Sequence, residues 1–201
     1  KAMIYKGLLY LSGLITLSLG VVLMIKAKVG IAPWDAVNVS LKNELGMSIG
    51  FWVFVVGSIL ILVNALIKRG KPNFLGFIPI VIIGVMIDGW NMTILFNEKS
   101  MGLTGKWLLF FTGLLVLSSG IALYIRSSLP MVPNDEFMVE LSKRTGWSLA
   151  WTKTCGEGLA WSIAFILKGP IGIGTLLVLG CLGILIHTFS RFMDRMKIPK
   201  Y

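Results

Sequence analysis

Long apolar runs alternate with short polar connections along the chain. Six of these runs are close to the ~20 residues that a helix needs to cross the hydrocarbon core of a bilayer. They predict transmembrane helices at residues 4–25, 48–67, 73–96, 106–125, 148–167 and 171–193. A shorter segment that begins with Pro and ends before Gly follows the first and fourth runs, and these helix-start and helix-stop signals predict two further helices, 33–45 and 133–145.

The chain consists of two similar halves. A shift of 100 residues aligns positions 6–50 with positions 106–150, and 16 of these 45 positions are identical. The matches include Gly13 with Gly113, Pro33 with Pro133, and Asp35 with Asp135. This similarity indicates an internal duplication.

Each half contains three predicted spans. Because three is an odd number, the second half enters the bilayer from the side opposite to the first. The sequence therefore predicts an all-α membrane protein with six transmembrane helices, in which two inverted three-helix repeats, about 4–97 and 104–195, form one membrane domain over 1–201. Inverted repeats are typical of secondary transporters, whose solutes bind near the middle of the bilayer beside broken helices. The two short helices fit this role as re-entrant segments, or they lie on the membrane surface as amphipathic helices.

Composition agrees with a membrane protein and excludes a soluble domain. The 201 residues are 56% hydrophobic and 14% charged, whereas soluble domains carry about 25% charged residues. The net charge is +10, but the chain lacks the basic, aromatic-interleaved patch that nucleic-acid binders use, so we expect a lipid bilayer as the partner and no nucleic acid. With a cytoplasmic N-terminus, twelve of the 19 Lys and Arg residues lie inside and six lie outside. The positive-inside rule therefore predicts that both termini are cytoplasmic.

Two ionisable residues occupy equivalent positions in the third helix of each half. Asp88, within the run Asp88-Gly89-Trp90-Asn91, aligns with the only histidine, His187, when the shift is 99 residues. Charged groups within spans are costly and mark candidate functional sites. An Asp–His pair near the pseudo-twofold axis can relay protons, because His titrates near neutral pH. The alternative is a structural hydrogen bond between helices, or a buried neutral His.

A second polar pair lies in the fifth predicted span. Lys153 and Glu157 are four residues apart and share a helix face, whereas their counterparts Val53 and Gly57 are uncharged. This asymmetry is expected when one half becomes specialised for binding, so both residues are candidates for the solute or proton site. The alternative is a self-neutralising pair whose lysine extends toward the membrane interface.

The repeated acids Asp35 and Asp135 lie in the first turns of the short helices. There they stabilise the helix N-termini; if the helices are re-entrant, the same carboxylates face a central cavity and can bind a cation. Trp34 and Trp90 either line such a pocket and stack on a cationic ligand, or belong to the aromatic belt at the membrane interface. Asn91 completes the set of candidate binding residues.

Two short motifs resemble those of a known family. Residues 30–35 read Gly-Ile-Ala-Pro-Trp-Asp, and residues 46–50 read Gly-Met-Ser-Ile-Gly. They resemble the YczE/YyaS/YitT group of small bacterial membrane proteins, and are most similar to its YczE branch. The second half keeps the Pro and Asp of the motif at 133–135 but not the Trp. The resemblance implies a six-span protein of the bacterial plasma membrane.

These features favour a proton-coupled secondary transporter of a small organic solute. The alternatives are the substrate-binding membrane subunit of a larger importer, and a regulator or assembly factor that does not transport. An enzyme is not expected, because only His187 is available to activate a nucleophile. Cys155 and Cys181 lie in apolar runs, so neither a disulfide framework nor a metal site is expected, and no cofactor is implied. Two thin three-span halves favour a homodimer.

Overall fold

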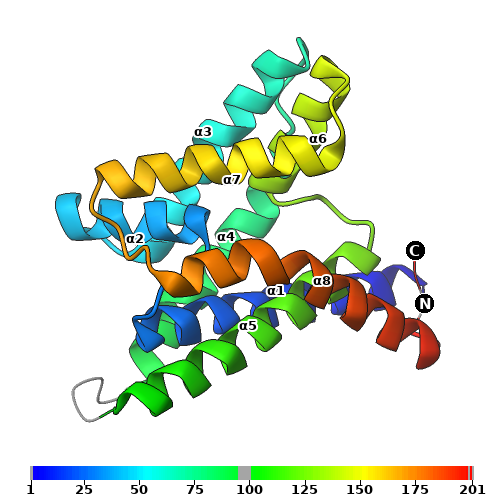
Figure 1. The fold of residues 1–201 in the computed structure, drawn as a ribbon. Helices are drawn as coiled ribbons and strands as arrows, with labels where there is room; N and C mark the ends of the chain where they lie inside the picture. The colour runs from blue at the N-terminus through cyan, green and yellow to red at the C-terminus, as the bar shows by residue number, and fades with distance from the viewer. Residues whose placement is uncertain (1, 95–100, 199, 201) are drawn as a thin grey trace.

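The computed structural model describes residues 2–94, 101–198 and 200, and these residues form helices joined by short connections (Figure 1). They contain eight α-helices, one short 3-10 helix and no strand. The first half comprises α1 Ala2–Ala27, α2 Pro33–Leu45, α3 Ile49–Ile67, the 3-10 helix η1 Phe74–Gly76 and α4 Phe77–Thr93. The second half comprises α5 Leu103–Arg126, α6 Pro133–Thr145, α7 Leu149–Ile166 and α8 Ile173–Arg195.

Five helical segments are long and apolar enough to cross a membrane. They are Met3–Ala27, Ile49–Ile67, Phe74–Thr93, Leu103–Arg126 and Ile173–Arg195. They correspond to five of the six predicted spans, although residues 95–96 of the third predicted span and residue 97 of the first repeat lie outside the described residues. The remaining predicted span, 148–167, forms the helix α7, but α7 is not among the five. The reason is its composition, because Lys153, Glu157 and interspersed Gly and Thr residues lower its mean hydropathy.

The longest helices of the two halves, α1 and α5, pack antiparallel through glycines. A Cβ atom at Gly13 would lie 2.9 Å from the carbonyl oxygen of Gly120, and one at Gly120 would lie 2.8 Å from the carbonyl oxygen of Gly13. Gly20 and Gly113 make the same reciprocal contact, with corresponding distances of 2.7 and 3.0 Å. Glycine permits this close backbone approach, as it does at many helix pairs in membranes. When each residue is replaced by its counterpart in the other half, the Gly13–Gly120 contact becomes the Gly113–Gly20 contact.

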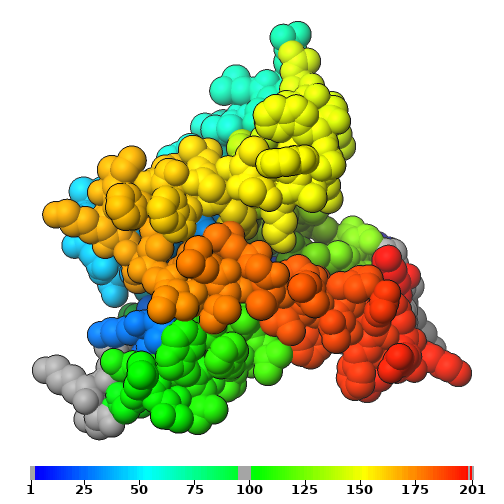
Figure 2. Space-filling view, viewed as in Figure 1, coloured from blue at the N-terminus to red at the C-terminus, as the bar shows by residue number. Residues whose placement is uncertain are grey.

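The outer helices differ between the halves. In the first half, α4 contacts both α1 and α3, and a Cβ atom at Gly84 would lie 2.8 Å from the carbonyl oxygen of Gly50. In the second half, α8 packs on α5, but no described atom lies close to its Gly183, the counterpart of Gly84. Helix α7 therefore does not pack on α8 as α3 packs on α4. Figure 2 shows that α5, α7 and α8 make up most of one face of the molecule.

The two short helices match their predicted bounds and are built in the same way. Each follows an extended residue and begins with Pro, and each ends at a glycine with positive φ, 79° at Gly46 and 73° at Gly146. A serine then caps the following helix, because Ser48 accepts a hydrogen bond from the backbone N–H of Phe51 and Ser148 from that of Trp151. Local sequence thus determines the same helix ends and the same serine cap twice, although the turns between them differ, with ψ of −155° at Gly46 and 6° at Gly146.

Both short helices lie between α3 and α7, so each contacts one helix of the opposite half. In α6, the carbonyl oxygen of Pro133 accepts a hydrogen bond from the Asn64 side chain of α3 at 2.9 Å. In α2, the consecutive residues 36–40 are all buried, which requires protein on every side of this part of the helix. The first turns of α2 and α6 are therefore enclosed within the bundle, where they reach a central cavity.

Candidate functional site

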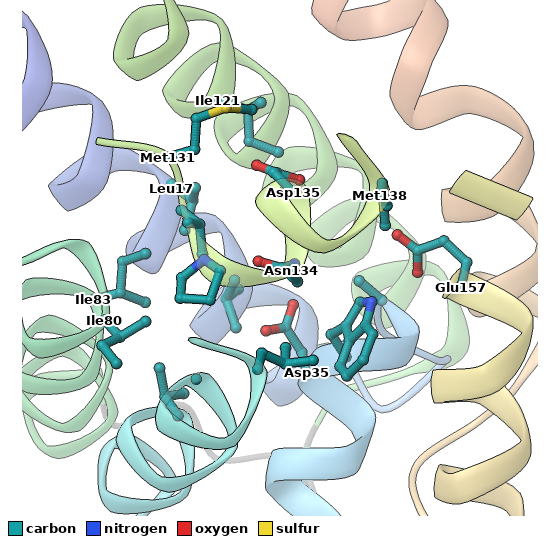
Figure 3. A pocket seen from close by; sticks show the side chains of 18 of the residues that line it. Leu17, Asp35, Ile80, Ile83, Ile121, Met131, Asn134, Asp135, Met138 and Glu157 are labelled. Atoms are coloured by element: carbon teal, nitrogen blue, oxygen red, sulfur yellow. The ribbon is translucent and has the colours of Figure 1, made fainter. Parts of the chain in front are cut away.

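A cavity of about 280 Å³ lies where the two halves meet. The first turns of α2 and α6 contribute polar side chains, α7 contributes two charged ones, and α1, α3, α4, α5 and α8 contribute apolar ones. Figure 3 shows Asp35, Asn134 and Asp135 near the middle of this group, with Glu157 on one side and Ile80 and Ile83 on the other. The volume is close to the lower end of the roughly 300–1,000 Å³ that small-molecule sites occupy.

The carboxylates of Asp35 and Asp135 occupy equivalent positions in this cavity but differ in their partners. Asp135 accepts a hydrogen bond from the hydroxyl group of Tyr124 on α5. Asp35 has no hydrogen bond or ion pair within the described part of the chain. Burial raises the pKa of Asp35 to about 7. Burial also raises the pKa of Asp135, although the Tyr124 hydrogen bond and the positive charge of Lys153 act against this shift.

The partner of Asp135 is itself held by aromatic packing. The rings of Tyr124 and Tyr10 meet edge to face with their centroids 6.4 Å apart. The hydroxyl group of Tyr10 donates a hydrogen bond to the carbonyl oxygen of Pro130 at 2.8 Å. The helix pair α1–α5 thus positions the Tyr124 hydroxyl group beside Asp135.

Helix α7 contributes the other charges. Lys153 and Glu157 both line the cavity, as their shared helix face predicts. Oε2 of Glu157 is buried without a hydrogen-bond partner among the described residues. The equivalent positions of α3, Val53 and Gly57, line the same cavity with an apolar surface. The charge asymmetry in the sequence is therefore an asymmetry between two walls of one cavity.

Two further side chains of α2 line the cavity, and each carries a buried polar atom without a described partner. Trp34 is 8% exposed and Asn38 is 6% exposed. Nε1 of Trp34 and Oδ1 of Asn38 have no hydrogen-bond partner within the described part of the protein. An unsatisfied buried polar atom costs about 1–3 kcal/mol, so such atoms at a cavity favour a bound molecule that satisfies them.

The other candidates lie outside this cavity. Asp88 accepts hydrogen bonds from the Ser48 hydroxyl group at 2.5 Å and from the Gly50 backbone N–H at 2.9 Å, and it thereby joins α4 to the start of α3. His187 is exposed on α8, and no hydrogen bond or ion pair between described atoms joins it to Asp88. Trp90 is half-buried, with Nε1 unpartnered among the described residues, and Asn91 lines a second hollow together with Lys26 and Lys42.

The residues predicted for the site from the sequence did not include Asn38, Asn134 or Tyr124. Asn38 lies three residues after Asp35, so helical spacing already placed the two on one face. Asn134 replaces the Trp of the first motif, which marks a difference between the two walls of the cavity. Tyr124 has no sequence signal of this kind, because its role depends on contact between α5 and α6.

Comparison with known proteins places the chain in a family. Residues 4–191 match the sequence profile of a family of unknown function, DUF6198. The chain belongs to this family. The family resemblance inferred from the motifs is confirmed by two relatives from Bacillus subtilis strain 168. The chain is 34% identical to the uncharacterized protein YyaS over 97% of both chains, and 30% identical to the uncharacterized membrane protein YczE over 93% of this chain and 86% of YczE.

A more distant relative comes from Haemophilus influenzae. This uncharacterized protein is 24% identical over 90% of the chain and 81% of its own length. No solved structure matches the chain. Together with the five apolar helices of membrane-spanning length, the similarity to a membrane protein of the family identifies this chain as a multi-pass membrane protein.

Proposed function

We propose that this protein is a secondary transporter of the bacterial plasma membrane, and that its small organic solute binds in the central cavity. The observation that carries the proposal is the position of this cavity between two copies of one helical pattern, with Asp35 and Asp135 at equivalent places in its wall. Secondary transporters built from inverted repeats bind their solutes at the interface of the repeats.

The packing of α1 on α5 supports an inverted arrangement. A twofold axis that exchanges the Gly13–Gly120 contact with the Gly113–Gly20 contact must run across this antiparallel pair. If α1 and α5 cross the bilayer, such an axis lies in the membrane plane. Exchange of the halves also converts the contact of α2 with α7 into that of α6 with α3, and both contacts are present.

In this proposal α7 also crosses the membrane, which brings the number of spans to six. A charged residue exposed to lipid at the centre of a span costs about 2.5–3.5 kcal/mol on insertion scales. Lys153 and Glu157 avoid this cost because both line the cavity. With six spans the two termini lie on the same side of the membrane, and the distribution of Lys and Arg favours the cytoplasm.

The short helices α2 and α6 act as re-entrant segments whose N-termini reach the middle of the bilayer. Because each contacts a helix of the opposite half, rotation of one half against the other opens the cavity to alternate sides. The carboxylates in the cavity supply groups that exchange a proton during this cycle, which makes proton coupling the expected energy source.

Reconstitution tests the proposal. Purified protein in liposomes is assayed for uptake of a panel of small amines, carboxylates and neutral solutes, with and without a pH gradient, against empty liposomes. We expect saturable flux of at least one solute, and its loss in the double variant Asp35→Asn/Asp135→Asn. The matched control is Glu44→Gln, which changes an exposed acid on α2 outside the cavity and should leave flux unchanged.

Two outcomes contradict the proposal. One is the absence of flux above that of empty liposomes for every solute, with protein that remains monodisperse. The other is undiminished flux in the double variant. If binding occurs without flux and an ATPase module co-purifies, the protein is instead the substrate-binding subunit of a larger importer.

A further inference from the structure

The charges in the central cavity indicate which solutes it accepts. We infer that the cavity binds a small organic cation with an apolar body, whose positive group lies beside Asp35. This inference rests on the proposed transport function and adds the class of solute to it. Four observations carry it: the balance of charges, the unpaired carboxylate of Asp35, the unsatisfied atoms of α2 and the apolar walls.

The balance of charges is negative. Among the described residues, three carboxylates line the cavity, those of Asp35, Asp135 and Glu157, together with one cation, Lys153. The N-termini of α2 and α6 add about half a positive charge each, so the ionised cavity retains a negative charge. This negative charge repels a bound anion, whereas a bound cation neutralises it.

The carboxylate of Asp35 is the one that a solute can reach. Asp135 already accepts the hydrogen bond of Tyr124 and experiences the positive charge of Lys153. Glu157 lies one helical turn from Lys153 and experiences its positive charge, although Oε2 of Glu157 has no hydrogen-bond partner among the described residues. Asp35 has no such partner within the described residues, although it faces the same cavity. An ammonium group beside Asp35 would provide the missing charge-assisted hydrogen bond.

Two side chains of α2 that line the cavity carry buried polar atoms without a partner among the described residues. Oδ1 of Asn38 is an acceptor on the same helix face as Asp35, and rotation of this side chain would present it to a second N–H group of the solute. Nε1 of Trp34 is a donor that suits an oxygen atom of the solute or a water molecule. Both side chains are more than nine-tenths buried, so bulk solvent does not satisfy these atoms.

Apolar side chains form most of the remaining wall, among them Leu17, Val21, Ile80, Ile83 and Ile121. They suit a hydrocarbon body rather than a hydrated inorganic ion, because burial of apolar surface contributes about 25 cal/mol per Å². The cavity volume of about 280 Å³ suits one aromatic ring with a short side chain. A primary or secondary amine of this size combines both properties.

Four phenyl compounds of similar size test the inference. Their affinities for the detergent-solubilised protein are compared by isothermal titration calorimetry at about pH 8, where an Asp of ordinary or moderately raised pKa is ionised. The compounds are 2-phenylethylammonium, 3-phenylpropionate, 2-phenylethanol and L-phenylalanine. We expect the ammonium compound to bind at least about ten-fold more tightly than the other three, as one charge contact in a partly buried site allows. Equal affinities, tighter binding of the anion or the zwitterion, or no binding of any compound overturns the inference.

Charge variants separate recognition by charge from damage to the fold. Asp35→Asn should weaken binding of the ammonium compound at least about ten-fold, whereas Lys153→Gln should strengthen it several-fold, because it removes a repelling charge. Glu44→Gln on α2 is the control and should leave the affinity unchanged. Weaker binding in both cavity variants, with unchanged thermal unfolding, would contradict recognition by charge.

The same compounds distinguish the solute class from transport itself. If 2-phenylethylammonium binds but neither it nor any other solute of the panel enters proteoliposomes, the cation site stands and the transport function fails. If 3-phenylpropionate or L-phenylalanine is transported and the ammonium compound is not, transport stands and the inferred solute class fails.

Discussion

The glycine contacts between α1 and α5 allow a quantitative prediction about how the two halves are held together. Gly20→Ala would place a Cβ atom 2.6 Å from Cα of Leu117, and Gly120→Ala would place one 2.7 Å from Cα of Leu17. Both distances are far below the 3.4 Å at which such contacts become ordinary. Because the opposing atoms belong to backbone, the helices must separate, and overpacking of this kind costs about 1–3 kcal/mol.

The upper part of that range applies here, since no flexible side chain can move away. Replacement of Gly by Ala within a helix recovers about 1 kcal/mol of helix propensity, so we expect a net loss of about 2 kcal/mol in each variant. For a chain of this size, 1 kcal/mol corresponds to roughly 2–4 °C in Tm, which predicts a decrease of about 4–8 °C for both variants.

Thermal unfolding in detergent, followed by tryptophan fluorescence, measures this decrease. The matched control is Gly7→Ala on α1, where an added Cβ atom meets no described atom within 4 Å, so its Tm should equal or exceed that of the wild type. The two variants should also agree with each other, because their contacts are equivalent under the repeat. Wild-type stability in both, or a large loss in only one, would refute the reciprocal packing of the halves.

Three further predictions concern single charges. The charged groups that share the cavity with Asp35 are Asp135, Lys153 and Glu157. Because the pKa of Asp35 is raised to about 7, its carboxyl group is neutral below that pH and charged above it. Calorimetry should therefore find tighter binding of 2-phenylethylammonium as the pH rises from about 6 to about 8. An affinity that does not change with pH would contradict a role of Asp35 in binding. Asp88→Ala should lower the free energy of unfolding by about 1.5–3 kcal/mol, the range for hydrogen bonds to charged groups, while solute flux into proteoliposomes persists. Loss of this flux in a variant that still folds would instead support a proton relay through Asp88. Leu159→Lys, on the exposed face of α7, should reduce membrane insertion, and normal insertion would contradict a lipid-facing position.

Local signals in the sequence predicted the short helices to the residue. The Pro at each start and the Gly at each end act through the backbone of neighbouring residues, so no tertiary contact is needed to locate them. The enclosure of α2 and α6 between α3 and α7 was not predictable in this way. Their periodicity is the same for a helix on a membrane surface and for one within a bundle, and only the packed structure separates the two.

The charged residues of the cavity were predictable from the sequence, but their arrangement and the neighbouring Asn38 and Asn134 were not. Four charged residues were candidates because charges are rare in an apolar chain, and the structure brings all four to one cavity. They are Asp35, Asp135, Lys153 and Glu157. The pairing of Asp88 with the histidine of α8 assumed that both halves pack alike. Asp88 instead holds the start of α3, because α4 packs closely on α3 whereas α8 does not pack in this way on α7.

The departure from symmetry in the second half has a physical explanation. In α3 the residues that line the cavity are apolar, and the Gly50–Gly84 contact brings α4 against the helix. In α7 the corresponding surface carries Lys153 and Glu157, which need the space and the polar surroundings of a cavity rather than close helix packing. Separation of α7 from α8 provides that space in the second half only. The duplicated scaffold thus encloses a cavity with unlike walls, because Lys153 and Glu157 occur in one copy only while the glycines that join the halves remain in both.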